Sequence, residues 1–157
     1  MELTNKKEGN SMFSINHVMM NVDVNSKEEV LNLISNKALQ LGITDNVEML
    51  YQAFLDREKE SCTGMQDGIA IPHAKTNAVL SPSLIFVSVN KKLEWESLDD
   101  KPIDTIFALL APNTNGCIEH LQMLSNLATQ LIDDDFIESI KKAKTANEVV
   151  GIIERVF

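Results

Sequence analysis

The chain has 157 residues and a mass of 17.5 kDa, which is about the size of one domain. Its hydrophobic content of 44% is too high for a disordered chain, and its longest apolar stretch, Ile106 to Ala111, is too short to span a bilayer. The 14 basic and 23 acidic residues give a net charge of −9, which argues against nucleic acid as a partner because phosphate binding depends on clustered Lys and Arg. We therefore expect one soluble, cytoplasmic domain that binds no nucleic acid and does not insert into a membrane.

The N-terminal residues differ in character from the rest of the chain. Residues 1–14 are polar and lack periodicity, so we predict a flexible tail there and a single domain over residues 15–157. Apolar and polar residues then alternate over residues 18–24, and this period of two favours a strand with one buried face.

Two helices are predicted next, each beginning at a capping motif. Ser26 and Glu29 have the spacing of a capping box, in which each side chain bonds to the main-chain amide of the other residue, and Gly42 ends the helix. Asp45 and Glu48 have the same spacing and predict a second helix, which ends in a run of charged residues.

Three extended segments follow the helices. Residues 68–71 form a short strand, which we expect Pro72 to end because proline cannot donate to a strand ladder. Residues 84–89 and 103–111 are nearly continuous apolar runs, as is typical of strands covered on both faces.

Helices also dominate the C-terminal part of the chain. A turn at residues 113–116 leads into a helix, followed by a short helix over 134–143 and a last helix that begins at a capping box of Thr145 and Glu148. The residues expected to face inward from the first of these helices are Ile118, Leu121, Leu124, Ala128 and Leu131. Helices before and after buried strands predict an α/β fold, with a mixed β-sheet sandwiched between α-helices in a single domain.

The three histidines are the most informative polar residues. His17 is interpreted as a surface or strand-end residue. His73 follows Pro72 after a glycine-containing loop, and His120 lies in the first turns of the helix that follows the turn at 113–116. Ligand-handling residues favour such junctions between a rigid element and a loop, and a helix N-terminus keeps an imidazole neutral. From the residues alone, either histidine could equally be structural.

Other chemistries find less support in the sequence. Cys62 near His73 suggests a Cys–His hydrolase, but no group that would lower the thiol pKa or orient the pair is visible. No HxxH or HExxH spacing indicates a metal site, and the glycine patterns of phosphate-binding loops are absent. We expect neither a metal nor a cofactor.

The segment from Arg57 to Lys75 closely resembles the active-site signature of a bacterial protein family. This family comprises the enzyme IIA domains (type 2) of the fructose–mannitol class of the phosphoenolpyruvate-dependent sugar phosphotransferase system. The resemblance continues through Trp95-Glu96-Ser97-Leu98-Asp99, Lys101-Pro102, Ala111-Pro112 and Glu119-His120-Leu121, so it covers residue 15 to the C-terminus and is strongest for the fructose branch. Asp100 replaces a glycine that is frequent in the family, for which we expect only a local change in a turn.

The resemblance implies a phosphocarrier with defined residue roles. His73 corresponds to the phosphoryl acceptor, with the tele nitrogen expected to carry the group, and His120 corresponds to a second histidine that stabilises the phosphoryl oxygens. Arg57 would position the phosphoryl group through bidentate bonds, and Thr63 would donate to the other imidazole nitrogen or to a phosphoryl oxygen. No metal is required, because phosphoryl transfer has a loose transition state that depends on positioning and charge stabilisation.

The same resemblance implies the partners. Phosphorylated HPr would be the donor and a IIB domain the acceptor, with a IIC permease downstream, for uptake of a fructose-type sugar. The first alternative is a regulatory, nitrogen-type IIA protein that uses the same phosphohistidine as a switch. The second is the Cys62–His73 hydrolase on an unrelated α/β scaffold.

Overall fold

The computed structural model describes residues 12–114 and 118–156, which form a mixed five-stranded sheet and its flanking helices. The strands are β1 (Val18–Val22), β2 (Ile69–Ala70), β3 (His73–Lys75), β4 (Ser83–Leu93) and β5 (Ile103–Ala111). The helices are the 3₁₀ helix η1 (Ile15–His17), α2 (Lys27–Gln40), α3 (Val47–Glu60), α4 (Ile118–Gln130), α5 (Asp134–Lys142) and α6 (Ala146–Glu154). None of the helices in the described ranges is long and apolar enough to cross a bilayer.

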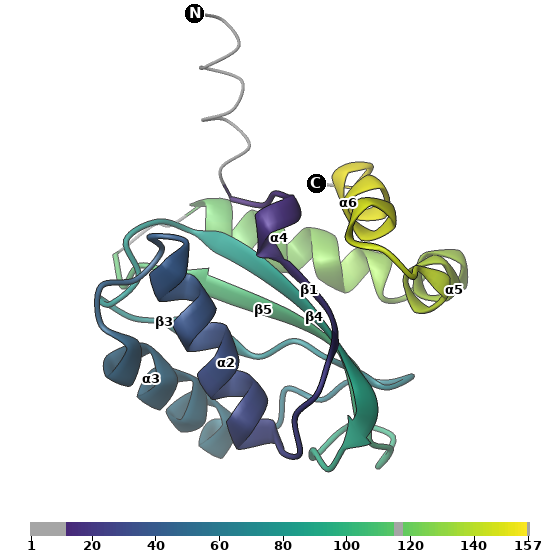
Figure 1. The fold of residues 1–157 in the computed structure, drawn as a ribbon, viewed down its shortest axis with the longest axis horizontal. Coiled ribbons are helices and arrows are strands. Elements are labelled where there is room, and N and C mark those ends of the chain that lie inside the picture. Colours follow the sequence, from purple (N-terminus) through teal and green to yellow (C-terminus); the bar gives the residue numbers. More distant parts are fainter. Residues whose placement is uncertain (1–11, 115–117, 157) are drawn as a thin grey trace, which may run out of the picture.

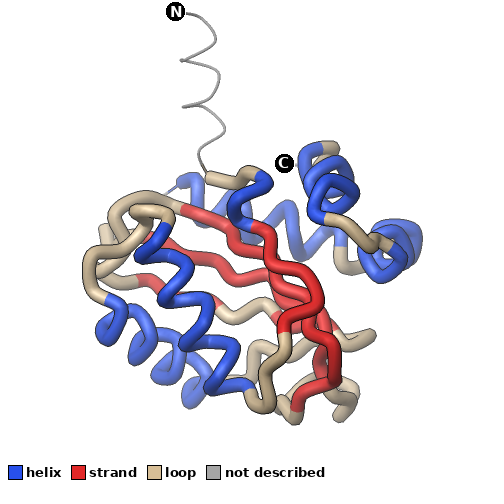
Figure 2. The backbone as a smooth tube through the Cα atoms, viewed as in Figure 1, coloured by secondary structure: helices blue, strands red, loops and turns tan. Residues whose placement is uncertain are grey.

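The sheet separates two layers of helices. Helices α2 and α3 cover one face, and α4, α5 and α6 cover the other (Figures 1 and 2). Alternate residues of the central strand β5 supply both cores: Ile106, Ala108 and Leu110 pack toward α2 and α3, whereas Phe107 and Leu109 pack toward α4, α5 and α6. The predicted α/β fold with a mixed sheet between helices is confirmed.

Strand directions explain why the sheet is mixed. The sheet order is β1-β4-β5-β2, and β3 also pairs with β5. Strands β4 and β5 run antiparallel, whereas β1 is parallel to β4 and both β2 and β3 are parallel to β5. The sheet therefore combines the antiparallel β4–β5 pair with parallel pairs on both sides of it, and the connection from β1 to β4 contains α2 and α3.

The prediction that the short strand ends at Pro72 is confirmed: β2 stops at Ala70, and a separate strand, β3, begins at His73. Ile69 pairs with Thr105 before the proline and His73 pairs with Leu109 after it, in the same register. The Pro72 carbonyl still accepts a hydrogen bond from the Leu109 amide at 2.9 Å. The proline thus interrupts the strand without changing its direction, and pairing with β5 resumes at His73.

Two of the three predicted capping boxes need correction. Ser26 caps α2 by accepting from the Glu29 amide at 3.1 Å, but the Glu29 carboxylate accepts from the Asn25 amide and not from that of Ser26. Helix α3 is capped by Asn46, one position later than predicted. The third box is confirmed at the start of α6, where Thr145 forms the reciprocal pair of bonds.

The predicted inward face of α4 is also wrong in part. Among the side chains of this helix that the structure describes, Met123 and Leu127 are buried, whereas Leu121 is 62% exposed and Ile118 is 68% exposed. The periodic pattern contained two overlapping apolar stripes, and only packing against the sheet selects between them.

The N-terminal boundary of the packed structure lies before the predicted residue 15. The Met12 carbonyl accepts a hydrogen bond from the Leu84 amide at 2.9 Å, and Phe13 packs against the core on the α4, α5 and α6 side. Ser14 caps η1. Residues 12–14 thus belong to the packed structure, although they fall within the segment predicted as a tail.

The loop between β4 and β5 packs closely against the loop that precedes β2. The Leu98 amide donates to the Gly64 carbonyl at 3.2 Å, and a Cβ atom at Gly64 would lie 2.3 Å from the Glu96 carbonyl oxygen. A glycine at position 64 is therefore required by the close approach of the two loops.

Asp100 stands at the position where a glycine is frequent in the family. It adopts a φ of 60° and so keeps the left-handed turn.

We expect Gly64→Ala to destabilise the protein by roughly 1–3 kcal/mol, because two main-chain segments would have to move apart. The measurement is the free energy of unfolding in urea. Gly151→Ala is the matched control, since a Cβ there meets nothing within 4 Å and helix propensity predicts a gain of up to ~1 kcal/mol. Equal stability of the two variants would contradict this account of the loop contact.

Candidate functional site

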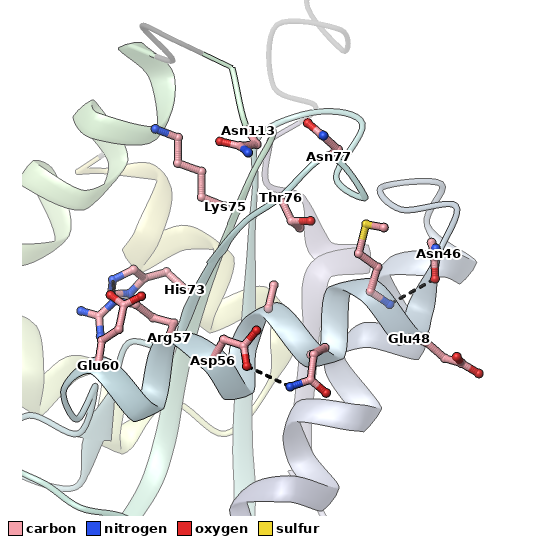
Figure 3. A pocket seen from close by; sticks show the side chains of 13 residues that line it. Asn46, Glu48, Asp56, Arg57, Glu60, His73, Lys75, Thr76, Asn77 and Asn113 are labelled. Carbon is pink, nitrogen blue, oxygen red and sulfur yellow. Dashed lines mark hydrogen bonds between the residues drawn. The ribbon is translucent and has the colours of Figure 1, made fainter.

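The ring of His73 is held by hydrogen bonds at both of its nitrogens. His73 is the first residue of β3, and its Nδ1 lies 2.7 Å from the Ile71 carbonyl oxygen. Arg57, in the last turn of α3, donates its Nε–H to His73 Nε2 at 3.0 Å. Figure 3 shows the two side chains next to each other, with Glu60 at the same end of α3.

These bonds define the protonation state of the neutral ring. Because a carbonyl oxygen can only accept, Nδ1 must carry the proton, and because Arg57 can only donate, Nε2 must present its lone pair. His73 therefore has a nucleophilic Nε2, the tele nitrogen, and a protonated Nδ1.

The environment keeps this imidazole neutral. Burial is the largest influence and lowers the pKa of His73 below its ordinary 6.5, and the charge of Arg57 lowers it further. The bond to the Ile71 carbonyl and the charges of Glu58 and Glu60 oppose this shift without cancelling it. At neutral pH Nε2 therefore carries no proton and keeps the lone pair that accepts from Arg57.

Arg57 is itself held in place. Its Nη1 donates to the Ser61 carbonyl at 2.9 Å and to the Ser61 hydroxyl at 3.2 Å, just beyond the end of α3. The guanidinium is thus anchored by one end while its Nε faces His73. Such an anchored cation can stabilise a negatively charged group placed next to the imidazole.

Thr63 does not contact the His73 ring. Its hydroxyl donates to the Glu58 carboxylate, and the ring nitrogen that the resemblance allowed as its partner is bonded to Ile71 instead. Thr63 is only 2% exposed. The structure brings Arg57 and His73 together. Thr63 is connected to the ring only indirectly, because its carbonyl bonds to the Ile71 amide and the Ile71 carbonyl bonds to His73.

An open groove of about 960 Å³ runs from His73 along α3. Residues of both signs of charge line the groove at its His73 end: Arg57 and Lys75 are positive, whereas Asp56 and Glu60 are negative. Asn46, Glu48, Met49, Gln52, Ala53, Thr76, Asn77 and Asn113 complete it (Figure 3). An open, polar groove suits contact with another protein better than enclosure of a small molecule.

His120 lies in the first turn of α4, which follows β5. Its side chain is outside the part of the chain that the structure describes. The chain leading to this helix does reach the groove, because Asn113 lines it only two residues after Ala111, the partner of Lys75 in the sheet.

The remaining candidates lie apart from this arrangement. His17 ends η1 directly before β1, is 6% exposed and has Nδ1 bonded to the amide and hydroxyl of Ser14, so it is a buried strand-end residue. Burial lowers the pKa of His17. The only hydrogen-bond partner of the Cys62 sulfur among the described residues is the Gly64 carbonyl, at 3.9 Å, so no Cys62–His73 pair is formed there. The described residues also contain no cluster of three potential metal ligands.

Sequence reasoning missed two side chains and one main-chain group that organise the site. Glu58 and Ser61 lie within the recognised signature, but nothing in their spacing tells which atoms they bond. The Ile71 carbonyl has no signal in sequence, because every residue carries one.

A half-buried neutral histidine beside an anchored arginine in an open groove defines a protein that can carry an anionic group covalently. The family model described as "Phosphoenolpyruvate-dependent sugar phosphotransferase system, EIIA 2" matches residues 11–156. The chain belongs to this family and is therefore a phosphotransferase component that accepts a phosphoryl group on histidine. This agrees with the resemblance to the fructose–mannitol class.

Individual relatives carry two kinds of name. The fructose-specific EIIA component of Haloferax volcanii is 34% identical over 131 residues, which cover 83% of this chain and 84% of the relative. The nitrogen regulatory protein of Klebsiella oxytoca is also 34% identical, over 134 residues that cover 84% of this chain and 81% of the relative. The crystal structure of the nitrogen regulatory protein IIA-Ntr from Neisseria meningitidis has a TM-score of 0.84 at 26% identity, covering 92% of this chain and 98% of that one.

We expect the His73 ring to titrate below pH 6.5, because burial disfavours its charged form. The rate at which the protein accepts a phosphoryl group should then be independent of pH above 6.5 and should fall as the pH drops through the pKa of His73 and Nε2 becomes protonated. The ring pKa is measured by NMR titration of the histidine Cε1–H signals, assigned with His73→Ala. A midpoint at or above 6.5 would contradict this interpretation.

Proposed function

We propose that this protein is a phosphocarrier that accepts a phosphoryl group from phosphorylated HPr on His73 Nε2 and passes it to a IIB domain. The observation that carries the proposal is the pair of bonds that leaves the Nε2 lone pair facing Arg57 and the groove while Nδ1 keeps the proton. Family membership supports the reaction class, and the resemblance supports the choice of histidine and partners.

The chemistry requires no added acid or base. The Nε2 lone pair attacks phosphorus and forms a new P–N bond, while the P–N bond of the donor histidine breaks and its electron pair returns to the donor ring. His73 keeps its Nδ1 proton throughout, so the phosphorylated ring is cationic. The Ile71 carbonyl, 2.7 Å from Nδ1, stabilises this positive charge.

Arg57 has a different task before and after transfer. Its Nε–H occupies the Nε2 lone pair in the unphosphorylated protein, so this bond must break as phosphorus approaches. The guanidinium, still anchored at Ser61, then donates to the phosphoryl oxygens and stabilises their charge. His120 would serve the same oxygens from α4.

The downstream role has two versions, and both are cytoplasmic. In the first, the IIB domain supplies a IIC permease that takes up a fructose-type sugar, as the name of the Haloferax relative suggests. In the second, the phosphohistidine is a regulatory switch, as the name of the Klebsiella relative suggests. The relay residues are the same in each, so the acceptor protein decides between them.

Intact mass after incubation with phosphoenolpyruvate, enzyme I and HPr tests the proposal. Wild type should gain one acid-labile phosphoryl group, and His73→Ala should gain none, because the nucleophile is lost. The His73→Ala protein must keep its circular dichroism spectrum for the comparison to hold. Phosphorylation of His73→Ala at the normal rate would overturn the assignment.

A separate prediction concerns His120. His120→Ala should still accept the phosphoryl group but pass it to the IIB domain more slowly, by on the order of 100-fold for a lost charge-stabilising contact in transfer. Gln122→Ala, at an exposed position of the same helix, is the control. Stopped-flow or quenched transfer assays measure both rates, and normal onward transfer by His120→Ala would exclude the stabilising role.

A further inference from the structure

Two consecutive residues near the end of α3, Arg57 and Glu58, are connected to the two ring nitrogens of His73 by different routes. Arg57 reaches Nε2 directly at 3.0 Å. The Glu58 carboxylate turns to the following loop instead, where it accepts from the Thr63 hydroxyl and, at 3.4 Å, from the Thr63 amide. The buried position of Thr63 makes this a defined contact and not a surface pair.

The contact at Thr63 continues to the ring through main-chain bonds. The Thr63 carbonyl accepts from the Ile71 amide at 2.9 Å, and the Ile71 carbonyl accepts from His73 Nδ1–H at 2.7 Å. Pro72 between Ile71 and His73 has a fixed φ and restricts Ile71 to extended conformations. The two ends of Ile71 are therefore coupled, and movement of Thr63 displaces the carbonyl that holds Nδ1.

We propose that Glu58 is a positioning residue that selects the reactive tautomer of His73 by holding Thr63, and through it the Ile71 carbonyl. This rests on the proposed function, in which Nε2 is the nucleophile. If the Ile71 carbonyl moves away, the proton can shift to Nε2. That tautomer has no lone pair at the reacting position and places two donors, Nε2–H and Arg57 Nε–H, against each other.

If Glu58 acted only through its charge, its removal would change the pKa of His73 and leave the tautomer unchanged, as removal of another nearby carboxylate would. Both Glu58 and Glu60 carry charges that raise the pKa of His73. Glu60 lies two residues further along at the end of α3, but no hydrogen bond joins it to Thr63 among the described residues. Glu60→Gln therefore removes a comparable charge without touching the loop and is the matched control.

The experiment records the ring nitrogens of His73 by ¹⁵N NMR in unphosphorylated protein, at a pH above the ring pKa. Wild type should show a protonated Nδ1 and an unprotonated Nε2. Glu58→Ala and Thr63→Val should shift both nitrogens toward a mixture of tautomers and slow phosphoryl acceptance by about three- to tenfold, the range for one lost hydrogen bond. Thr63→Ser keeps the hydroxyl and should restore both measurements.

The control variant is expected to change the pKa of His73, whereas the result that would overturn the proposal concerns its tautomer. Glu60→Gln should lower the His73 pKa while leaving the tautomer unchanged. If Glu58→Ala and Thr63→Val both keep the wild-type tautomer, the proposal is wrong, even when their transfer rates fall. The amide NMR spectrum of each variant shows whether it is folded. If Glu58→Ala fails to fold, the comparison of Thr63→Val with Thr63→Ser decides whether the proposal holds.

The ring measurement needs no phosphoryl donor, so it is independent of the proposed function. A wild-type protein that shows the single tautomer but accepts no phosphoryl group would contradict the proposed function alone. A phosphorylated wild type with unchanged tautomers in the variants would contradict the role of Glu58 alone.

Discussion

The hydrogen bond between His73 Nδ1 and the Ile71 carbonyl is the interaction on which the site depends. It assigns the proton to one ring nitrogen and so leaves the other with a lone pair. The rest of the local structure keeps the two partners in place: β3 pairs with β5 at His73, and the Thr63 carbonyl holds the amide of Ile71. The carbonyl two residues before His73, on the other side of Pro72, thus determines which ring nitrogen keeps a lone pair.

In the proposed reaction the imidazole has to meet two opposing demands. The ring must be neutral to act as the nucleophile, which burial and Arg57 favour, but its phosphorylated form would be cationic and would need nearby negative charge. The Ile71 carbonyl and the carboxylates at the end of α3 would supply that charge. Because the groove is open, these groups could act while the ring remains reachable by another protein, as the proposed relay between two proteins requires.

Local rules predicted the elements well where packing did not compete with them. The Thr145 capping box and the continuous strand at 103–111 are as predicted, because each depends on neighbours in sequence. Pro72 ends β2 as predicted, but the local rule did not predict that the chain pairs with β5 again from His73 in the same register. The predicted inward face of α4 is wrong in part, because packing against the sheet decides which apolar stripe is covered.

The sequence by itself determined the fold class, the family resemblance and the two residues that meet at the centre of the site, His73 and Arg57. These follow from periodicity and from an uninterrupted motif, both of which are written along the chain. Only the tertiary structure decided that Thr63 bonds to Glu58 and that the Ile71 carbonyl selects the ring nitrogen. The first contact joins two side chains whose spacing does not reveal it, and the second uses a main-chain oxygen of the kind that every residue carries, so only the folded path of the backbone establishes them.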